Sequence, residues 1–306
     1  MLFVLLLSLP LFAYGGKEES DPFRIAVIMP DASESFWSGV WKGLEKGASE
    51  NRARISTYPF PAARPDLADK ELEKALLSKV DGVILASGRL SDKTLELFEK
   101  ARSEGIKIIL TDSSDQDTLS DAFISLDNQA SGREMAEELA GRGFASVLAL
   151  SSGQDSASLS TALRSMAMAE RFEESGIDYS VETLDMAVFT ASRRMEELVL
   201  ACPEGTCLVP LNSRLTLMTA ETVEQLGRGD ALFVAGWCEE PEAFRYVSSG
   251  VIDLLATQDV YTLGRESVRI LTSLLEGGET ERENYMPAVM VDRDNLAEYW
   301  DGERRL

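Results

Sequence analysis

The stretch FRIAVIMPDASESFWSGVWKG, residues 23–43, contains the two patterns that decide the fold. Residues 23–29 form an apolar run that only Arg24 interrupts, which suits a strand that is covered on both faces. The residues that follow indicate that the strand gives way to a helix. Phe36 and Trp37 stand side by side at this junction, where large apolar side chains need a partner. That partner is either the protein core or a ligand.

Short apolar runs alternate with helical patterns along the rest of the chain. Segments such as SDKTLELFEKARSEG, residues 91–105, have apolar residues at helical spacing, a polar start and a glycine stop. This alternation predicts an α/β fold with parallel sheets, and ten strands are many for one sheet, so we expect two sheets in two lobes. The ten expected strands are residues 23–29, 54–60, 80–87, 106–112, 122–127, 146–152, 179–184, 206–212, 231–237 and 253–258.

The composition excludes several classes of function. The chain has 306 residues, of which 52 are acidic and 30 basic, so its formal net charge is −22 and we expect no nucleic-acid partner. It contains no histidine, which removes the usual general base and the commonest metal ligand. We therefore expect no metal, no cofactor and no catalytic residue. No glycine-rich phosphate-binding motif occurs either.

The three cysteines lack the paired spacing of a zinc site. Cys202 and Cys207 bracket the sequence PEGT. In an oxidising compartment they could close a small loop, and the alternative is two free, partly buried thiols. The sequence leaves both open.

The first residues predict export from the cytoplasm. Residues 1–21 begin with about a dozen apolar residues, followed by small and then charged ones, which is typical of a signal peptide and too short to span a membrane. LFAYGG also looks like a lipoprotein cleavage box with Tyr14 in place of the cysteine. We expect a periplasmic or extracytoplasmic protein.

Ligands of open α/β sheets bind outside the carboxyl ends of the strands. The residues that follow the apolar runs are aromatic, acidic, amide-bearing and seldom aliphatic, which predicts a polar pocket with flat walls. They are Phe36, Trp37, Ser87, Gly88, Arg89, Asp112, Ser113, Asn212, Trp237, Cys238 and Gln258.

At these residues the chain resembles the type I periplasmic binding proteins, in the branch of ribose- and galactose-binding proteins that serve ABC transporters. The resemblance rests on four long segments in order, residues 24–48, 81–113, 123–140 and 231–278. It implies two Rossmann-like lobes joined by a three-segment hinge. The N-terminal lobe would comprise residues 22–126 and 259–289, and the C-terminal lobe residues 127–258 and 290–306.

The resemblance also assigns sugar contacts. Flat aromatic walls suit the C–H faces of a sugar, and planar polar groups suit its hydroxyls. The matching residues are Phe36, Trp37, Asp112, Arg164, Asn212, Trp237 and Gln258. The chain differs from the ribose branch at Glu34, Ser87, Ser113 and Cys238. The pattern of hydroxyls that it recognises should therefore differ from that of ribose. Arg89 and Phe189 are further candidates.

These observations predict a monomeric binding protein that captures a monosaccharide or a derivative between its lobes and delivers it to a membrane ABC permease. One alternative has the same fold, but the protein senses its ligand and signals through a chemoreceptor or a sensor kinase. A sugar-responsive transcriptional regulator shares the fold but needs a basic helix-turn-helix head, and only an apolar leader precedes Phe23. A glycosidase that uses Glu34 and Asp112 is the enzymatic alternative.

Overall fold

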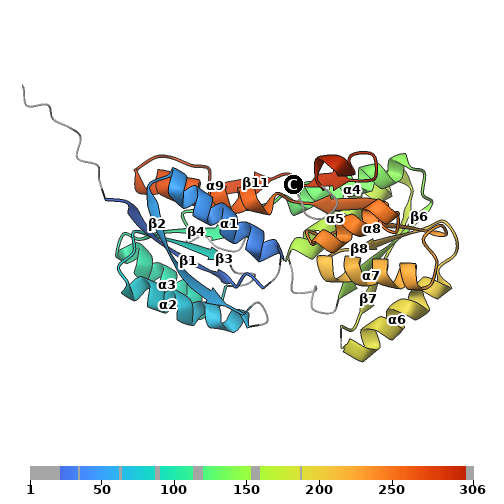
Figure 1. Ribbon diagram of the computed structural model, residues 1–306, viewed down its shortest axis with the longest axis horizontal. Helices are drawn as coiled ribbons and strands as arrows, with labels where there is room; N and C mark the ends of the chain where they lie inside the picture. Colours follow the sequence, from blue (N-terminus) through green and yellow to red (C-terminus); the bar gives the residue numbers. More distant parts are fainter. Residues whose placement is uncertain are drawn as a thin grey trace, which may run out of the picture.

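The computed structural model describes residues 21–33, 35–61, 64–86, 90–112, 120–152, 159–186 and 188–300. These residues form two lobes that lie side by side along the long axis of the molecule (Figure 1). Each lobe is built on one six-stranded sheet. The predicted α/β fold with two mainly parallel sheets is confirmed.

The sheet of lobe 1 has the strand order β11-β5-β4-β3-β1-β2, and all of its strand pairs are parallel. In its four central strands most residues are apolar and buried, because helices cover both faces. Its strands are β1 (Phe23–Pro30), β2 (Ala53–Phe60), β3 (Gly82–Ala86), β4 (Lys107–Thr111), β5 (Ala122–Leu126) and β11 (Glu283–Met286).

The sheet of lobe 2 repeats this order as β12-β10-β9-β8-β6-β7, with β12 antiparallel to β10. Its strands are β6 (Ser146–Ser152), β7 (Asp178–Leu184), β8 (Thr206–Pro210), β9 (Leu232–Trp237), β10 (Leu254–Thr257) and β12 (Val289–Val291). All ten predicted strands are present. The two edge strands β11 and β12 were not predicted, because they have only four and three residues and lack a continuous buried apolar run.

Four helices sandwich the sheet of lobe 1. The pair α2 (Ala68–Leu77) and α3 (Asp92–Ser103) covers one face, where Ala26, Ile28 and Leu85 point. The other face is covered by α1 (Ser35–Glu50) and α9 (Val260–Leu275). Alternate residues of each strand therefore belong to two separate cores.

Lobe 2 has the same layering, with five α-helices among its described residues. The helices α4 (Asn128–Gly141) and α5 (Leu159–Ser175) pack on one face of the sheet. The opposite face is covered by α6 (Val188–Ala201), α7 (Ser213–Gln225) and α8 (Pro241–Ser249).

The chain passes between the two sheets at three places. The first lies between β5 and α4, because β5 belongs to lobe 1 and α4 packs against α5 of lobe 2. The second lies between β10 and α9, which packs against α1. The third lies between β11 and β12. Each lobe is thus assembled from separate stretches of the chain.

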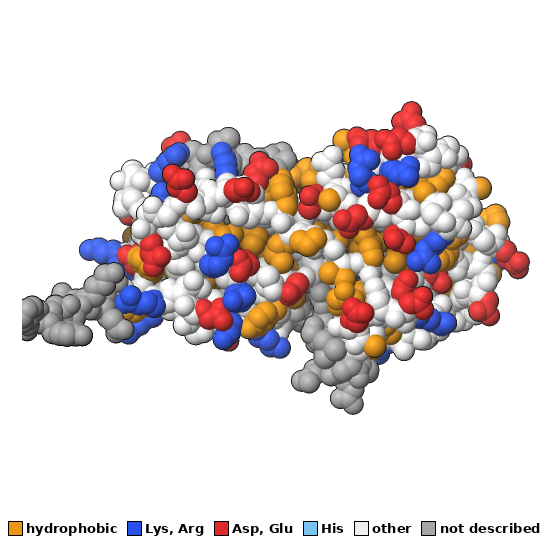
Figure 2. All heavy atoms as spheres, turned by 90° about the horizontal axis from the view of Figure 1, so that it is seen from above, with side chains coloured by type: hydrophobic (Ala, Val, Ile, Leu, Met, Phe, Trp, Pro, Cys, Tyr) orange, Lys and Arg blue, Asp and Glu red, His pale blue; other side chains and the backbone are white. Residues whose placement is uncertain are grey.

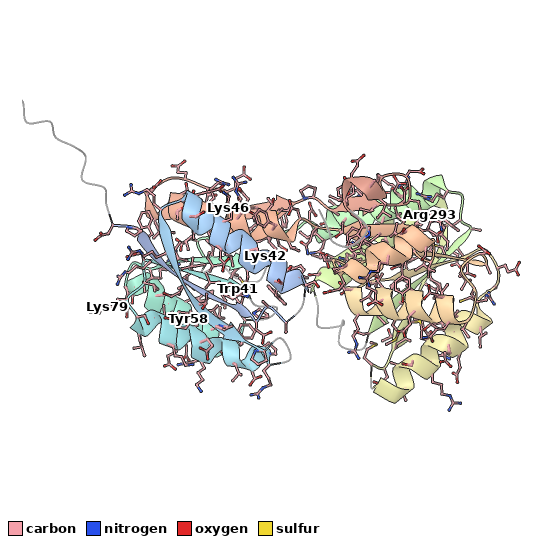
Figure 3. The ribbon with its side chains drawn as sticks, in the orientation of Figure 1. Trp41, Lys42, Lys46, Tyr58, Lys79 and Arg293 are labelled. Carbon is pink, nitrogen blue, oxygen red and sulfur yellow. The ribbon has the colours of Figure 1, made fainter. Side chains whose placement is uncertain are left out.

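Helices α1 and α9 approach each other closely through glycines. A Cβ atom at Gly43 would lie 2.0 Å from the backbone oxygen of Tyr261, and one at Gly264 would lie 2.1 Å from that of Val40. Gly39 and Gly47 extend the same contact one turn in each direction. The opposite side of α1 faces solvent and carries Lys42 and Lys46 (Figure 3). We call this contact the glycine seam.

Charged side chains of both signs are interspersed over the face seen in Figure 2, with no continuous basic patch on it. None of the helices in the described ranges is long and apolar enough to cross a membrane. Of the two alternatives for Cys202 and Cys207, the structure has the free thiols, and both side chains are buried. Burial raises the pKa of each thiol.

Candidate functional site

A cavity of about 420 Å³ lies between the lobes, which is within the usual size of a small-molecule site. Its walls come from the segments that follow β1, β4, β6, β7, β8, β9 and β10 at their carboxyl ends. This agrees with the rule that ligands of α/β sheets bind at that edge. We call it the interlobe cavity, and its lining is Phe36, Trp37, Asp112, Ser152, Ser160, Thr161, Arg164, Met186, Asn212, Ser213, Arg214, Glu239, Glu240 and Gln258.

Lobe 1 contributes an aromatic wall, formed by Phe36 and Trp37 in the first turn of α1. Their ring centroids are 4.7 Å apart and their planes are inclined by 81°. Both side chains are partly buried and also pack against the core beneath α1. Because the rings are nearly perpendicular, only one of them can lay its face on a given planar surface of a ligand, while the other presents an edge.

Asp112 follows β4 and is the acidic group that the described part of lobe 1 places in the cavity. Its backbone has a φ of 46°, in the left-handed region that Asp tolerates better than most residues, and its amide donates to the carbonyl of Ile124 at 3.0 Å. Burial and the negative charge of Glu239 raise the pKa of this carboxyl to about 6, although the positive charge of Arg164 opposes them. Asp112 is therefore mostly charged at pH 7 and takes up a proton in the mildly acidic range.

Arg164 on α5 is held in place by other groups of lobe 2 and is only 9% exposed. Its Nε donates to Oδ1 of Asn128 at 2.8 Å, and its Nη1 donates to the carbonyl of Leu211 at 3.0 Å. The guanidinium also lies over the ring of Trp237, 5.1 Å from the centroid. These contacts fix the direction in which the guanidinium faces the cavity.

Asn212 and Gln258 line the cavity at the ends of β8 and β10. Asn212 is the N-cap of α7, and its Oδ1 accepts a hydrogen bond from the amide of Leu215 at 2.9 Å. Gln258 lies where the chain leaves β10 for α9, is 4% exposed, and directs Nε2 towards Oε1 of Glu239 at 3.4 Å. One residue therefore caps a helix, and the other lies at a passage between the lobes.

Glu239 is a cavity residue that the sequence analysis missed. It is 9% exposed, and its Oε2 accepts a hydrogen bond from the hydroxyl of Ser213 at 3.1 Å. It lies two residues beyond the end of β9, so the rule about carboxyl ends would have found it had it been applied one residue past Cys238. The other lining residues not predicted are Ser152, Ser160, Thr161, Met186, Ser213, Arg214 and Glu240.

The structure places Trp237 and Cys238 differently from the expectation. Trp237 is 1% exposed, packs in the core beneath α4 and α5, and donates from Nε1 to Oγ of Ser131 at 2.7 Å. Cys238 is fully buried in the opposite core, beneath α6, α7 and α8. Trp237 ends β9 and Cys238 follows it, and the two side chains point to opposite faces of the sheet and fill the two cores, whereas Glu239 lines the cavity. Neither belongs to the cavity lining.

Burial determines the chemistry of the Cys238 side chain. It raises the pKa of the thiol, and the neighbouring Glu239 raises it further. The sulfur accepts a hydrogen bond from the amide of Glu240 at 3.4 Å. Cys238 is therefore a neutral core residue.

Six of the sequence-predicted site residues are thus brought together in the interlobe cavity: Phe36, Trp37, Asp112, Arg164, Asn212 and Gln258. Glu34, Ser87 and Arg89 lie outside the described residues, as do Ser113, the side chain of Phe189 and the N-terminal segment of residues 1–20. Within the described ranges, no group of three acidic or cysteine side chains could hold a metal ion.

Comparison with known proteins shows the family to which this chain belongs. The family model of the periplasmic binding protein domain matches residues 25–279. No curated protein matches the sequence. All of the solved structures described next are less than 25% identical to this chain, so their likeness concerns the fold.

The chain is similar to GanP, a glucose-galactose binding protein from Geobacillus stearothermophilus, with 19% identity, 90% of this chain and 99% of that chain covered, and a TM-score of 0.78. It is similar to a solute-binding protein of an ABC transporter from Agrobacterium vitis with bound D-fucose, with 21% identity, coverage of 89% and 96%, and a TM-score of 0.76. A putative LacI transcriptional regulator from Bacteroides fragilis has 18% identity, coverage of 91% and 100%, and a TM-score of 0.79.

Proposed function

This chain belongs to the periplasmic binding protein domain family, a family of binding proteins, and from that premise we propose that it captures a small sugar or sugar-like ligand in the interlobe cavity. The protein works outside the cytoplasm and delivers the ligand to an ABC transporter. Phe36, Trp37, Asp112, Arg164, Asn212 and Gln258 make the ligand contacts.

The observation that carries the proposal is the composition of the interlobe cavity. An aromatic wall from lobe 1 faces an arginine, an asparagine and a glutamate of lobe 2 across a volume of about 420 Å³. A sugar has apolar C–H faces and a rim of hydroxyls, so a ring face and charged or amide groups satisfy both parts. Each hydrogen bond to a charged group contributes about 1.5–3 kcal/mol.

Two observations on related folds support a sugar as the ligand. The neighbour from Agrobacterium vitis holds D-fucose, and a carbohydrate transporter binding protein from Agrobacterium radiobacter holds D-arabinose. Both ligands are small, polyhydroxylated rings of the kind that a cavity of this size accommodates.

The three passages between the sheets are the proposed hinge. Ligand contacts from both lobes would be made together only when the lobes close, so the ligand stabilises the closed form by its higher affinity for it. The closed form is then what the membrane partner recognises.

A thermal-shift screen over monosaccharides and nucleosides tests the proposal. A ligand that binds only the folded protein raises its stability by about 2.7 kcal/mol at a concentration of 100 times Kd. We expect one or a few related monosaccharides to raise Tm and the nucleosides to leave it unchanged. A nucleoside that binds while no sugar does would overturn the sugar proposal.

Transport is tested separately. This protein, with and without the ligand found in the screen, is added to membrane vesicles that contain a candidate ABC permease from the same organism, and ATP hydrolysis is measured. Ligand-loaded protein should stimulate hydrolysis more than the ligand-free protein does. Equal rates of ATP hydrolysis with and without ligand would contradict delivery to the transporter, but they would not contradict binding of the ligand.

A further inference from the structure

The first turn of α4 is buried but polar. The helix begins at Asn128, two residues after the end of β5, so this turn lies at the first passage between the lobes. Asn128, Ser131 and Gly132 are all buried, and their spacing places them on one face of the helix. A helix face that serves packing alone is apolar. The polar residues on this face therefore indicate a further role.

Asn128 uses both ends of its side-chain amide. Its Oδ1 accepts a hydrogen bond from Nε of Arg164 at 2.8 Å. Its Nδ2 donates to the carbonyl of Leu126, the last residue of β5 in lobe 1, at 3.2 Å. An arginine can only donate and a carbonyl can only accept, so this orientation of the amide is the one that satisfies both partners. One side chain thus joins the cavity arginine of lobe 2 to the main chain of lobe 1.

The same turn of α4 also restrains the main chain of Arg164. A Cβ atom at Gly132 would lie 2.5 Å from the backbone oxygen of Arg164 and 2.8 Å from its Cα, so α4 and α5 are in direct contact there. Ser131 accepts the hydrogen bond of Trp237, and the ring of Trp237 lies against the guanidinium. The start of α4 therefore contacts the backbone of Arg164 directly and its side chain from two sides.

We infer that Asn128 is a positioning residue that couples Arg164 to the first passage between the lobes. The inference rests on the proposed function, which makes the interlobe cavity the ligand site. Asn128 is not part of the cavity lining and acts on the ligand through the guanidinium of Arg164. Leu126 and Asn128 lie on either side of this passage, so the amide holds Arg164 in register with the end of β5. Rotation of the lobes about the passage therefore acts on the guanidinium as well as on the width of the cavity.

Two substitutions separate the two hydrogen bonds of Asn128. Asn128→Ala removes both. Asn128→Asp keeps an acceptor for Arg164 but places a carboxylate oxygen opposite the carbonyl of Leu126, where no donor remains. Asn284→Ala is the matched control, because Asn284 also donates to a carbonyl of β5, that of Phe123 at 3.1 Å, but lies on β11 and not in the cavity lining.

Hydrogen exchange measured by NMR reports both bonds without any ligand. The Nε–H signal of Arg164, assigned by its absence in Arg164→Met, reports the bond to Asn128. The backbone amide of Asp127, which donates to the carbonyl of Met286 at 2.9 Å, reports the passage. We expect both to exchange about tenfold faster in Asn128→Ala, and the Asp127 amide alone to do so in Asn128→Asp. The control should change neither rate.

Calorimetry with monosaccharides, D-fucose and D-arabinose among them, connects the positioning to binding. Asn128→Ala should lower the affinity for the sugar that binds about tenfold. In the Arg164→Met protein the same substitution should lower it less than about twofold, because no guanidinium is left to position. A residue that only supports the fold would cause the same loss in both proteins.

Three results would overturn the inference and leave the proposed function standing. They are an unchanged exchange rate of the Arg164 Nε–H in Asn128→Ala, an unchanged rate of the Asp127 amide in Asn128→Asp, and equal losses of affinity with and without the guanidinium. The second result decides the matter even where Asn128→Ala does not fold. If no monosaccharide binds, the proposed function is wrong, and the exchange rates still decide whether Asn128 positions Arg164.

Discussion

The guanidinium of Arg164 lies over the indole ring of Trp237, 5.1 Å from its centroid, so a core residue of lobe 2 holds a charged residue of the cavity in place. The indole is itself fixed, because its Nε1 donates to Oγ of Ser131 on α4. We therefore expect Trp237 to act on the site through Arg164, as a positioning residue, and not to supply a wall for the ligand.

Trp237→Ala should destabilise lobe 2 by about 3–5 kcal/mol, because it removes a fully buried ring. Trp237→Phe keeps most of the volume and removes the hydrogen bond to Ser131, so we expect a smaller loss of stability together with weaker ligand binding through a less fixed Arg164. Urea unfolding and calorimetry measure the two effects. If the Trp237→Ala protein kept its stability but lost ligand binding, Trp237 would be a ligand-contact residue and not a core residue.

Phe36→Ala should weaken ligand binding about tenfold, or about 1.4 kcal/mol, with a small change in Tm, since the ring is only partly buried. Tyr285→Ala is the matched control. Tyr285 forms a similar edge-to-face pair with Phe123, at 5.4 Å and 80°, but lies on the edge strand β11 and not in the cavity. Equal losses of affinity in both variants would exclude Phe36 from the site.

Asp112→Asn should stabilise the protein at neutral pH while it weakens ligand binding. The pKa of Asp112 is raised from 3.8 to about 6, so above pH 6 the folded protein bears the full cost of a charged carboxylate that the unfolded chain does not bear. The cost is below about 3 kcal/mol, because water in the open cavity screens part of it.

This stabilisation should disappear as the pH falls from about 6 to 3.8, where both states become protonated. Asn also tolerates the left-handed backbone at this position. Unfolding in urea at several pH values checks the prediction. A variant that is less stable than the natural protein at neutral pH would show that the charged carboxylate stabilises the fold.

Gly43→Ala should destabilise lobe 1 by about 1–3 kcal/mol or more, because its Cβ would clash with the backbone oxygen of Tyr261 and force α1 away from α9. Gly141→Ala is the control: it lies at the end of α4 with no atom within 4 Å of an added Cβ. The free energy of unfolding of the Gly141→Ala variant should rise by up to about 1 kcal/mol. Similar changes in both variants would contradict the glycine seam.

Cys238→Asp should destabilise lobe 2 by about 3–5 kcal/mol, because it buries an unpaired carboxylate beside Glu239. The resemblance to the ribose branch had instead placed Cys238 among the positions that change the hydroxyl pattern of the ligand. Cys238→Ala is the control and should cost far less. Should the acidic variant fold normally and change the ranking of sugars, Cys238 would belong to the site after all.

The strands and their grouping into two sheets could be predicted from the sequence, because the central strands are covered on both faces and therefore form apolar runs. The edge strands β11 and β12 could not be predicted in this way. Their pairing depends on partners that are far away in the sequence, such as Phe123 for Glu283 and Leu255 for Val291. Local pattern contains no information about such partners.

The cavity could be predicted in part for a similar reason. The rule about carboxyl ends gives the position of a residue along the chain and so found Asp112, Asn212 and Gln258. It does not give the face to which a side chain points, which is why Trp237 and Cys238 were placed in the cavity and Glu239 was missed. That Asp112 and Glu239 line one cavity depends on how the two lobes meet, and neither lobe's sequence encodes that alone.

The distribution of the four tryptophans makes the protein its own optical sensor. Trp237 and Trp300 are buried in the cores of lobe 2, and the indole nitrogen of Trp41 donates to the carbonyl of Pro30 beneath α1. Trp37 alone among them lines the cavity. The intrinsic tryptophan fluorescence should therefore shift when a ligand displaces water from Trp37. The Trp37→Phe variant should not show this shift. Ligand titrations then need no attached dye.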